Sequence, residues 1–361
     1  MAKRIVLMTA NVQGGIIQFT FQLYHVLKEL GYIVKVCAPH ELHDSNIDEV
    51  AKPDRLLYHK VKKVINKHEY KELAHRIEEV QPDYVWYCDD SVICSEVGLA
   101  LKASKVKQLL TLHDAGGYHP TYHESLRNKL LRQYVSLVNR FFYRKVHRFV
   151  LLSSESERTF RKRWPQYASL AVMMNLGAHI PQANEVQPQE METERQYLLF
   201  FGRIDKYKGI GFMLEAYREV EEQALPLVIA GSGTLSNEEH AILGKISNVT
   251  LINRYISDGE MKWLFSHAAA VVLPYIEATQ SGVIPIAYAY SKPVLVSSIP
   301  GLTQFVSDGE TGKVCKTREQ WVENLKEMNT QVAHEMATSV SQYYMEYLDW
   351  KRNVERMLSQ I

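Results

Sequence analysis

Cysteine is scarce and shows no regular spacing in this chain of 361 residues, which argues against a zinc site built on cysteine. The four cysteines, Cys37, Cys88, Cys94 and Cys315, lack the paired spacing that zinc ligands show. Three of them lie in or beside apolar strand-like runs, where buried thiols are usual. We therefore expect no metal site built on cysteine, and a reducing compartment.

Long hydrophobic runs and an excess of one charge are also lacking. No apolar segment is long enough to span a bilayer, and Met1–Met8 leads directly into a strand-like segment, so neither a transmembrane helix nor a signal peptide is expected. The formal net charge is +1, which does not suit a nucleic-acid-binding protein. We expect a cytoplasmic protein without a nucleic-acid partner.

Positive charge is concentrated in one region. Residues 123–163 hold eleven Lys/Arg against three Glu, and Arg140, Arg144 and Arg148 recur every four residues in a stretch predicted to be helical, 126–148. A basic face beside apolar and aromatic residues can rest on an anionic membrane, here the inner membrane face. The alternative is an ordinary solvated helix face.

Length and periodicity predict an α/β protein of two doubly wound domains. The hydrophobic content of 46% is ordinary, and strand-like and helix-like segments alternate along most of the chain. A polar, acidic, proline-bearing stretch at 181–196 interrupts this alternation and predicts a linker. We expect domains at 1–180 and 197–338, with a last helix at 339–361 that packs back on the first. A strand is also expected at 54–61.

In open α/β sheets ligands bind at the loops that follow the carboxyl ends of strands. In the first half these loops contain Gly14 and Gly15 after the first strand, 88–91, and His113–His119. In the second half they are 201–209, 231–233, 253–256 and the loop around Glu277. We expect a cleft between the two halves. The G-x-G-x-x-G spacing of a dinucleotide-binding loop is absent after the first strand.

Two of these loops in the second half suit an anion. Arg203 and Lys208 lie five residues apart on one loop, and an Arg fork with a Lys charge suits a diphosphate. Backbone N–H groups at Ser281, Gly282 and Val283 would face an anion at the start of a helix. Taken singly, each basic residue could be a surface charge, and the second loop an ordinary crossover.

The combined motifs resemble the family 4 glycosyltransferases of the GT-B fold, of the kind found in bacterial surface-polysaccharide enzymes. They are Phe-Gly-Arg-x-x-x-x-Lys-Gly at 201–209, Ile-Ala-Gly-Ser-Gly at 229–233, the Glu277 loop, Lys-Pro-Val at 292–294 and Asp-Gly-Glu-Thr-Gly at 308–312. The Gly14-Gly15 loop and His113-Asp114 match the N-terminal half of that family. The resemblance is stronger in the second half of the chain.

The resemblance implies retaining transfer of a hexose from a UDP- or GDP-sugar, without a cofactor or a required metal. Arg203 and Lys208 would hold the diphosphate with the amides of Ser281, Gly282 and Val283. Glu277 and His113 would meet the transferred sugar. The remaining donor-binding residues would be Gly14, Gly15, Gly202, Gly231, Tyr255, Ile256 and Gln280, with the Tyr255–Ile256 backbone at the base.

One position departs from the family pattern. The family carries two glutamates eight positions apart, and counting back from Pro293-Val294 places Ala278, beside Glu277, at the first position and Ile286 at the second. The second carboxylate commonly binds the nucleotide ribose in relatives, so the ribose must be held otherwise or the donor held more weakly.

The function implied is an enzyme that adds a sugar to a lipid-linked or oligosaccharide acceptor in cell-surface polysaccharide biosynthesis. An NDP-sugar 2-epimerase of the same fold is a second reading, although it would need more carboxylates and histidines at the cleft. A non-catalytic sugar-nucleotide-binding protein is a third, favoured by Ile286.

Overall fold

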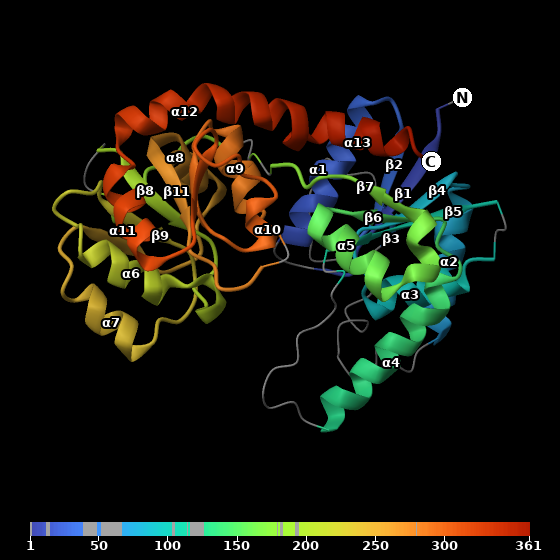
Figure 1. The fold of residues 1–361 in the computed structure, drawn as a ribbon. Helices are drawn as coiled ribbons and strands as arrows, with labels where there is room; N and C mark the ends of the chain where they lie inside the picture. Colours follow the sequence, from blue (N-terminus) through green and yellow to red (C-terminus); the bar gives the residue numbers. More distant parts are fainter. Residues whose placement is uncertain are drawn as a thin grey trace. The chain divides into compact units, whose positions relative to one another are not determined.

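The computed structural model forms two compact units (Figure 1). Unit 1 consists of Met1–Asn175 and Trp350–Ile361, and unit 2 of Leu176–Asp349. The residues that the structure describes are 2–11, 15–38, 49–51, 67–102, 105–113, 115, 126–178, 180, 183–191, 195–278 and 280–361, without the side chains of 49–51 and 126–132.

Unit 1 is built on a parallel sheet of seven strands in the order β3-β2-β1-β4-β5-β6-β7. Its strands are β1 (Arg4–Met8), β2 (Ile33–Cys37), β3 (Glu49–Ala51), β4 (Tyr84–Tyr87), β5 (Lys107–Leu112), β6 (Arg148–Leu151) and β7 (Ala171–Met173). Its helices are α1 (Gly15–Glu29), α2 (Lys67–Glu79), α3 (Val92–Ala100), α4 (Leu126–Tyr143), α5 (Ser154–Arg163), the 3-10 helix η3 (Pro165–Leu170) and α13 (Trp350–Leu358). Helices α2, α3 and α4 contribute to one buried cluster, while α1 and α13 lie side by side elsewhere on the unit (Figure 1).

Unit 2 contains a parallel sheet of six strands in the order β10-β9-β8-β11-β12-β13. The strands are β8 (Tyr197–Phe201), β9 (Leu227–Ala230), β10 (Val249–Ile252), β11 (Ala268–Leu273), β12 (Val294–Ser297) and β13 (Gly312–Cys315). The helices are η4 (Lys206–Lys208), α6 (Ile210–Arg218), α7 (Asn237–Leu243), α8 (Asp258–His267), α9 (Val283–Ala289), α10 (Pro300–Thr303), α11 (Arg318–Glu327), α12 (Thr330–Tyr343) and the π-helical turn η5 (Tyr344–Leu348). Helix α6 packs against α7 and α11, and α12 packs against α9 and β11 (Figure 1).

The strand orders confirm the predicted α/β doubly wound architecture. In unit 1 the order reverses between β1 and β4, and in unit 2 it reverses between β8 and β11. Loops that leave such neighbouring strands in opposite directions open a crevice, which is where ligands of these sheets bind. The loops that follow β8 and β11 carry Arg203, Lys208 and Glu277.

The helix predicted at 126–148 is too long. Helix α4 ends at Tyr143, and Arg148 begins β6, which pairs with β5 through Leu109 and Arg148. The apolar run that follows Arg148 belongs to a buried strand and not to the helix. Arg148 therefore does not share a helical face with Arg140 and Arg144. The strand predicted at 54–61 lies outside the described residues, and β3 precedes it.

The predicted linker and last helix also differ from the structure. Of the stretch 181–196, residues 183–191 belong to unit 2, and Met191 is buried in its core because its side chain is apolar. The helix predicted at 339–361 is divided by Asp349, whose backbone is extended at φ −68° and ψ 124°. Its first part belongs to α12 and η5 of unit 2, and only α13 belongs to unit 1.

The four cysteines are free thiols and are all buried. Burial raises the pKa of the Cys88, Cys94 and Cys315 thiols above the usual value, so these groups stay protonated at neutral pH. Within the described residues, the helices include none that is both long and apolar enough to span a membrane.

Candidate functional site

The loops after β8 and β11 are joined directly in unit 2. The Ile276 N–H donates to the Tyr207 carbonyl oxygen at 2.8 Å. Gly209 has φ +68°, and a Cβ there would lie 2.0 Å from the Pro274 carbonyl oxygen. Glycine is therefore required where the two loops cross, both for its backbone angle and for space.

Lys208 lies at this junction. Its side chain is half-buried, and Nζ lies 3.6 Å from the centroid of the Tyr275 ring. Burial and the nearby charge of Arg203 lower the pKa of Lys208 to about 7, against a smaller opposite effect of Asp205. An ammonium over an aromatic face is attracted to it, but a second cation nearby opposes its charge. Two such cations together suit a bound anion.

The loop after β11 continues into α9. Tyr275 is buried, and burial raises the pKa of its hydroxyl while the Ser281 hydroxyl beside it opposes the rise. Ser281 is buried too, and its Oγ accepts from the Val283 N–H at 3.2 Å. Gly282 is the N-cap of α9. Glu277 is exposed, Gln280 is half-buried, and Thr279 lies outside the described residues.

The glycines after β8 and β9 allow two loops to run in contact. Gly202 has φ +126° and Gly231 has φ +149°, and a Cβ on Gly231 would lie 1.9 Å from the Gly202 carbonyl oxygen. The Ile204 N–H donates to the Ser232 carbonyl oxygen at 2.9 Å, so the loops pair beyond the ends of their strands. This close pairing leaves Arg203 exposed on the loop surface.

The predicted residues of unit 1 are placed in part. Gly15 is the first residue of α1 and is exposed, whereas Gly14, Asp114 and residues 116–119 lie outside the described residues. His113 follows β5, and its Nε2 lies 2.9 Å from the Cys88 carbonyl oxygen, which can only accept. Burial lowers the pKa of His113, although the Cys88 carbonyl and Asp89 oppose this. The ring is therefore neutral, with its proton on Nε2.

Asp89 was not singled out from the sequence, yet it organises the loops of unit 1. It is buried, and its Oδ2 accepts from the Thr9 hydroxyl at 2.6 Å and the Ala10 N–H at 2.9 Å. Burial opposes ionisation, but hydrogen bonds from Ser91, Thr9 and Ala10 outweigh it and lower the pKa of Asp89. An ionised Asp89 thus fixes the start of the loop after β1. In the sequence, the one signal that could have identified Asp89 is its position just after a strand.

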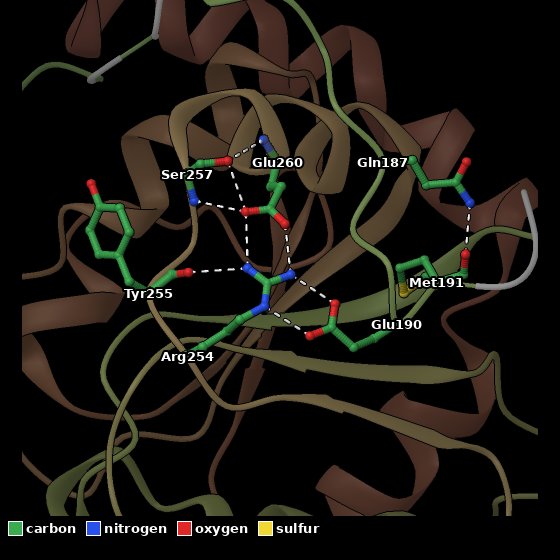
Figure 2. A network of polar contacts seen from close by, with 7 residues as sticks. All are labelled: Gln187, Glu190, Met191, Arg254, Tyr255, Ser257 and Glu260. Carbon is green, nitrogen blue, oxygen red and sulfur yellow. Dashed lines mark hydrogen bonds and ion pairs between the residues drawn. The ribbon is translucent and has the colours of Figure 1, made fainter.

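The predicted base-contacting residues, Tyr255 and Ile256, lie in the turn between β10 and α8. Tyr255 is 77% exposed. Figure 2 shows that the neighbouring Arg254 is bonded to Glu190 and Glu260, with N–O distances of 2.7 Å to each carboxylate. Ser257 caps α8 in a capping box with Glu260. These partners were also missed, since Glu190 lies 64 residues before Arg254.

Ile286, which stands at the position of the second glutamate in the family pattern, is buried in the core cluster of unit 2. No group of three or more His, Cys, Asp or Glu side chains suited to a metal ion occurs in the part of the chain that the structure describes.

Two family models match the chain, one in each half. Residues 13–173 match the model of Glycosyltransferase Family 4, and residues 195–331 match that of Glycosyl transferases group 1. Together the two matches span most of both sheets.

Curated relatives match over shorter stretches. An uncharacterized glycosyltransferase of Methanocaldococcus jannaschii is 29% identical over 126 residues, which cover 34% of this chain and 32% of that protein. A GDP-mannose:glycolipid 4-beta-D-mannosyltransferase of Xanthomonas campestris pv. campestris is 28% identical over 101 residues, 27% of this chain and 29% of that protein. The aligned part of the chain thus spans about a third of the length of these relatives.

Solved structures match over nearly the whole chain. Sucrose-phosphate synthase from Thermosynechococcus elongatus has a TM-score of 0.72 at 16% identity, covering 99% of this chain and 98% of that one. Anabaena Alr3699/HepE in complex with UDP-glucose has a TM-score of 0.70 at 15% identity, covering 99% and 98%. At such identities the likeness establishes the fold, which is the GT-B fold expected from the motifs. Each half of the chain thus matches a glycosyltransferase domain model, and the two halves together have the GT-B fold.

Proposed function

We propose that the chain transfers a hexose, with retention of configuration, from a UDP- or GDP-sugar to a lipid-linked or oligosaccharide acceptor in cell-surface polysaccharide biosynthesis. The observation that carries the proposal is that Arg203 and Lys208 lie on one loop, at the point where the strand order of unit 2 reverses. Two cations near enough to affect each other, one of them half-buried, favour a multiply charged anion such as a diphosphate.

The names of two similar proteins support the choice of donor. The Xanthomonas relative is named for GDP-mannose and a glycolipid, and Anabaena Alr3699/HepE was solved with UDP-glucose. In our proposal Arg203, Lys208 and the amides of Ser281, Gly282 and Val283 hold the diphosphate and stabilise the leaving group, and the Val283 N–H exchanges its hydrogen bond to Ser281 Oγ for one to the donor. Glu277 and Gln280 approach the sugar. Gly202 and Gly231 keep the loops beneath the donor close together.

Residues of unit 1 complete the proposal. A neutral His113 suits a hydrogen bond to a hydroxyl of the transferred sugar better than a contact with phosphate. Gly14 and Gly15 would pack against the donor phosphates. Charge on the leaving group is offset by Arg203 and Lys208, so no metal is required, and we expect transfer to continue when divalent ions are chelated with EDTA.

The proposal is tested first by melting the protein with UDP, GDP, ADP, CMP and NAD. A ligand that binds only the folded protein raises the melting temperature by mass action. We expect a shift with UDP or GDP that Arg203→Ala abolishes, together with loss of transfer. A shift with NAD, or no shift with any of the five ligands, would contradict the proposal.

Donor hydrolysis separates the proposal from the non-catalytic alternative that buried Ile286 favours. A transferase slowly passes its donor to water, whereas a binding protein would release no free sugar. The anomeric configuration of the transferred sugar, followed by NMR, tests retention.

Membrane contact is a separate part of the proposal and rests on α4. Leu137 is 52% exposed and Phe141 is 49% exposed, and Arg140 and Arg144 are exposed beside them. The spacing 137, 140 and 141 places the first three along one face of α4, and the guanidinium of Arg144, one residue past the end of the helix, lies 5.5 Å from the Phe141 ring centroid. Apolar and basic groups on one face suit an anionic lipid surface.

Liposome flotation tests this contact. We expect the protein to float with phosphatidylserine vesicles at low salt and to remain in solution with phosphatidylcholine alone. Replacing both Arg140 and Arg144 by Glu should abolish flotation, whereas Arg218→Glu, an exposed arginine of α6, should not. Binding that ignores lipid charge and salt would rule out this contact.

A further inference from the structure

Residues 183–191, here called the α8 strap, lie along helix α8 of unit 2. The Val186 N–H donates to the Gly259 carbonyl oxygen at 3.0 Å, and the Ser266 hydroxyl donates to Glu185 at 2.8 Å. A Cβ on Gly259 would lie 2.6 Å from the Asn184 carbonyl oxygen, so the strap needs a glycine there to pass this close. The strap is thus a fixed part of unit 2.

The strap ends at Glu190, which binds Arg254 in the turn before α8 (Figure 2). Arg254 Nε and Nη2 donate to Glu190 at 2.8 and 2.7 Å. Nη1 and Nη2 donate to Glu260 at 3.0 and 2.7 Å, and Nη1 also donates to the Tyr255 carbonyl oxygen at 3.1 Å. We call Glu190, Arg254 and Glu260 the Arg254 clamp.

The clamp uses every donor of the guanidinium. An arginine has five N–H groups, and five hydrogen bonds are made here. Arg254 therefore keeps no N–H for a phosphate, although it lies on a loop predicted from the sequence to face the ligand. The carboxylates are held equally firmly, since hydrogen bonding from Arg254 lowers the pKa of Glu260 to about 2 and lowers that of Glu190.

The clamp fixes the backbone on both sides of Ile256. Arg254 holds the Tyr255 carbonyl oxygen, and Glu260 accepts from the Ser257 N–H at 3.0 Å. Within the described part of the chain, the N–H and C=O of Ile256 itself make no hydrogen bond. An adjacent donor and acceptor, held between two fixed points, are what the edge of a nucleobase requires.

We propose that Glu190 and Glu260, acting through Arg254, position the Tyr255–Ile256 backbone for the base of the donor, and that Arg254 is a positioning residue and not a phosphate ligand. This inference rests on the proposed function and on the expectation, implied by the family resemblance, that the Tyr255–Ile256 backbone meets the base. Exposed ion pairs usually contribute little, but a bidentate pair shared by two carboxylates is geometrically strict. The Arg254 clamp contributes here by holding the exposed turn before α8 in one conformation before the ligand binds.

The experiment compares Glu190→Gln with a matched control. Arg318 is also bound by two carboxylates in unit 2, with distances of 2.7 Å to Glu219 and 3.1 Å to Glu215, away from the turn. Glu219→Gln therefore removes a similar pair without touching the clamp. Binding of UDP and GDP is measured by calorimetry alongside inorganic pyrophosphate, which lacks a base.

For Glu190→Gln we expect the Kd of the nucleoside diphosphate, and the KM of the corresponding sugar donor, to rise about tenfold with kcat nearly unchanged, because the turn is misplaced while the reacting groups are not. Binding of pyrophosphate should not change, and Glu219→Gln should behave as wild type. Arg254→Lys, which cannot make the paired hydrogen bonds, should lose at least as much nucleotide affinity.

The outcomes separate this inference from the proposed function. If wild type binds the nucleotide and Glu190→Gln binds it equally well, or if pyrophosphate binding weakens to the same degree, the positioning role is wrong and the transferase proposal stands. If wild type binds neither UDP nor GDP, the proposed function fails and the inference fails with it.

Discussion

At the scale of single residues, Lys208 combines burial, a neighbouring cation and an aromatic face. Its Nζ lies 3.6 Å from the Tyr275 ring centroid, and burial with Arg203 brings its pKa to about 7. A lysine of this kind is partly neutral at neutral pH, and a bound anion would restore its charge. The state of this one proton therefore reports on whether a diphosphate sits beside it.

We expect donor binding at pH 8 to take up close to one proton. The free side chain is mostly neutral above pH 7 and becomes charged beside the diphosphate, whereas at pH 6 it is already charged and little uptake follows. Affinity should therefore fall as the pH rises above about 7. Calorimetry of a UDP- or GDP-sugar in buffers of different ionisation enthalpy measures the uptake. The variant Lys208→Arg, whose side chain stays charged, should show no proton uptake. Equal uptake in wild type and variant would contradict the prediction.

The same burial should make Lys208 costly for stability. Between pH 7 and 10.5 the unfolded chain holds this proton and the folded chain does not, so the contribution of Lys208 to the free energy of unfolding rises with pH through that window. Lys208→Met should raise the melting temperature at pH 7 by roughly 2–4 °C for a gain of about 1 kcal/mol, while transfer is lost. Melting curves from pH 6 to 9 should show this advantage shrinking as pH rises. A lower melting temperature for the variant throughout would contradict it.

At the scale of elements, Gly98 of α3 lies directly against Phe142 of α4 in unit 1. A Cβ there would lie 2.1 Å from Cε2 of Phe142 on α4, and Phe142 is fully buried with its ring centroid 5.0 Å from that of Tyr87. The small residue therefore sets the separation of α3 and α4 beside the sheet.

Gly98→Ala should destabilise unit 1 by about 1–3 kcal/mol, since the added methyl overpacks a ring that has no room to move. Gly244→Ala is the matched control, because its nearest atom would be 3.6 Å away and its φ is −64°. The control should be neutral or slightly stabilising. Chemical denaturation of both variants decides the matter, and equal midpoints would contradict the packing argument.

The sequence predicts a helix or strand accurately only where local residues mark its ends. The start of helix α8 is readable in the sequence, because Ser257 and Glu260, three residues apart, form a capping box there. The helix before β6 was predicted too long because arginine spacing continued to Arg148, while pairing with β5, a long-range contact, ends it. Local patterns predict a helix well where a capping residue marks its end. They do not reveal whether the apolar run that follows will pair with a distant strand.

The candidate site follows the same rule. The motif pairing Arg203 with Lys208 is readable in the sequence, and the strand order places it at the reversal of the sheet. The ring that faces Lys208 comes from the loop after β11, and the partner of Arg254 comes from the α8 strap. Such partners are set by sheet order and by chain crossings, so they could not be predicted from spacing alone.

At the scale of the whole molecule, the chain completes unit 1 only with its last helix. Helix α13 buries Trp350, Val354 and Met357, and the Trp350 ring centroid lies 5.3 Å from that of Phe19 on α1. The Asn353 side chain donates to the Asn175 carbonyl oxygen at 3.1 Å, near the end of the first segment of unit 1. The integrity of unit 1 thus depends on residues synthesised after all of unit 2.

Trp350→Ala should loosen unit 1 without loosening unit 2. Removing a buried tryptophan costs about 3–5 kcal/mol, and the loss should appear as faster amide hydrogen exchange in α1, α13 and their neighbouring strands. Trp321→Ala, an equally buried tryptophan on α11, should produce the reverse pattern in unit 2. Because Arg203, Lys208 and the Arg254 clamp all lie in unit 2, binding of UDP or GDP should survive the first variant far better than transfer does. Uniformly faster exchange in both units for each variant would show instead that the two units unfold as one, and that nucleotide binding cannot be separated from the state of α13.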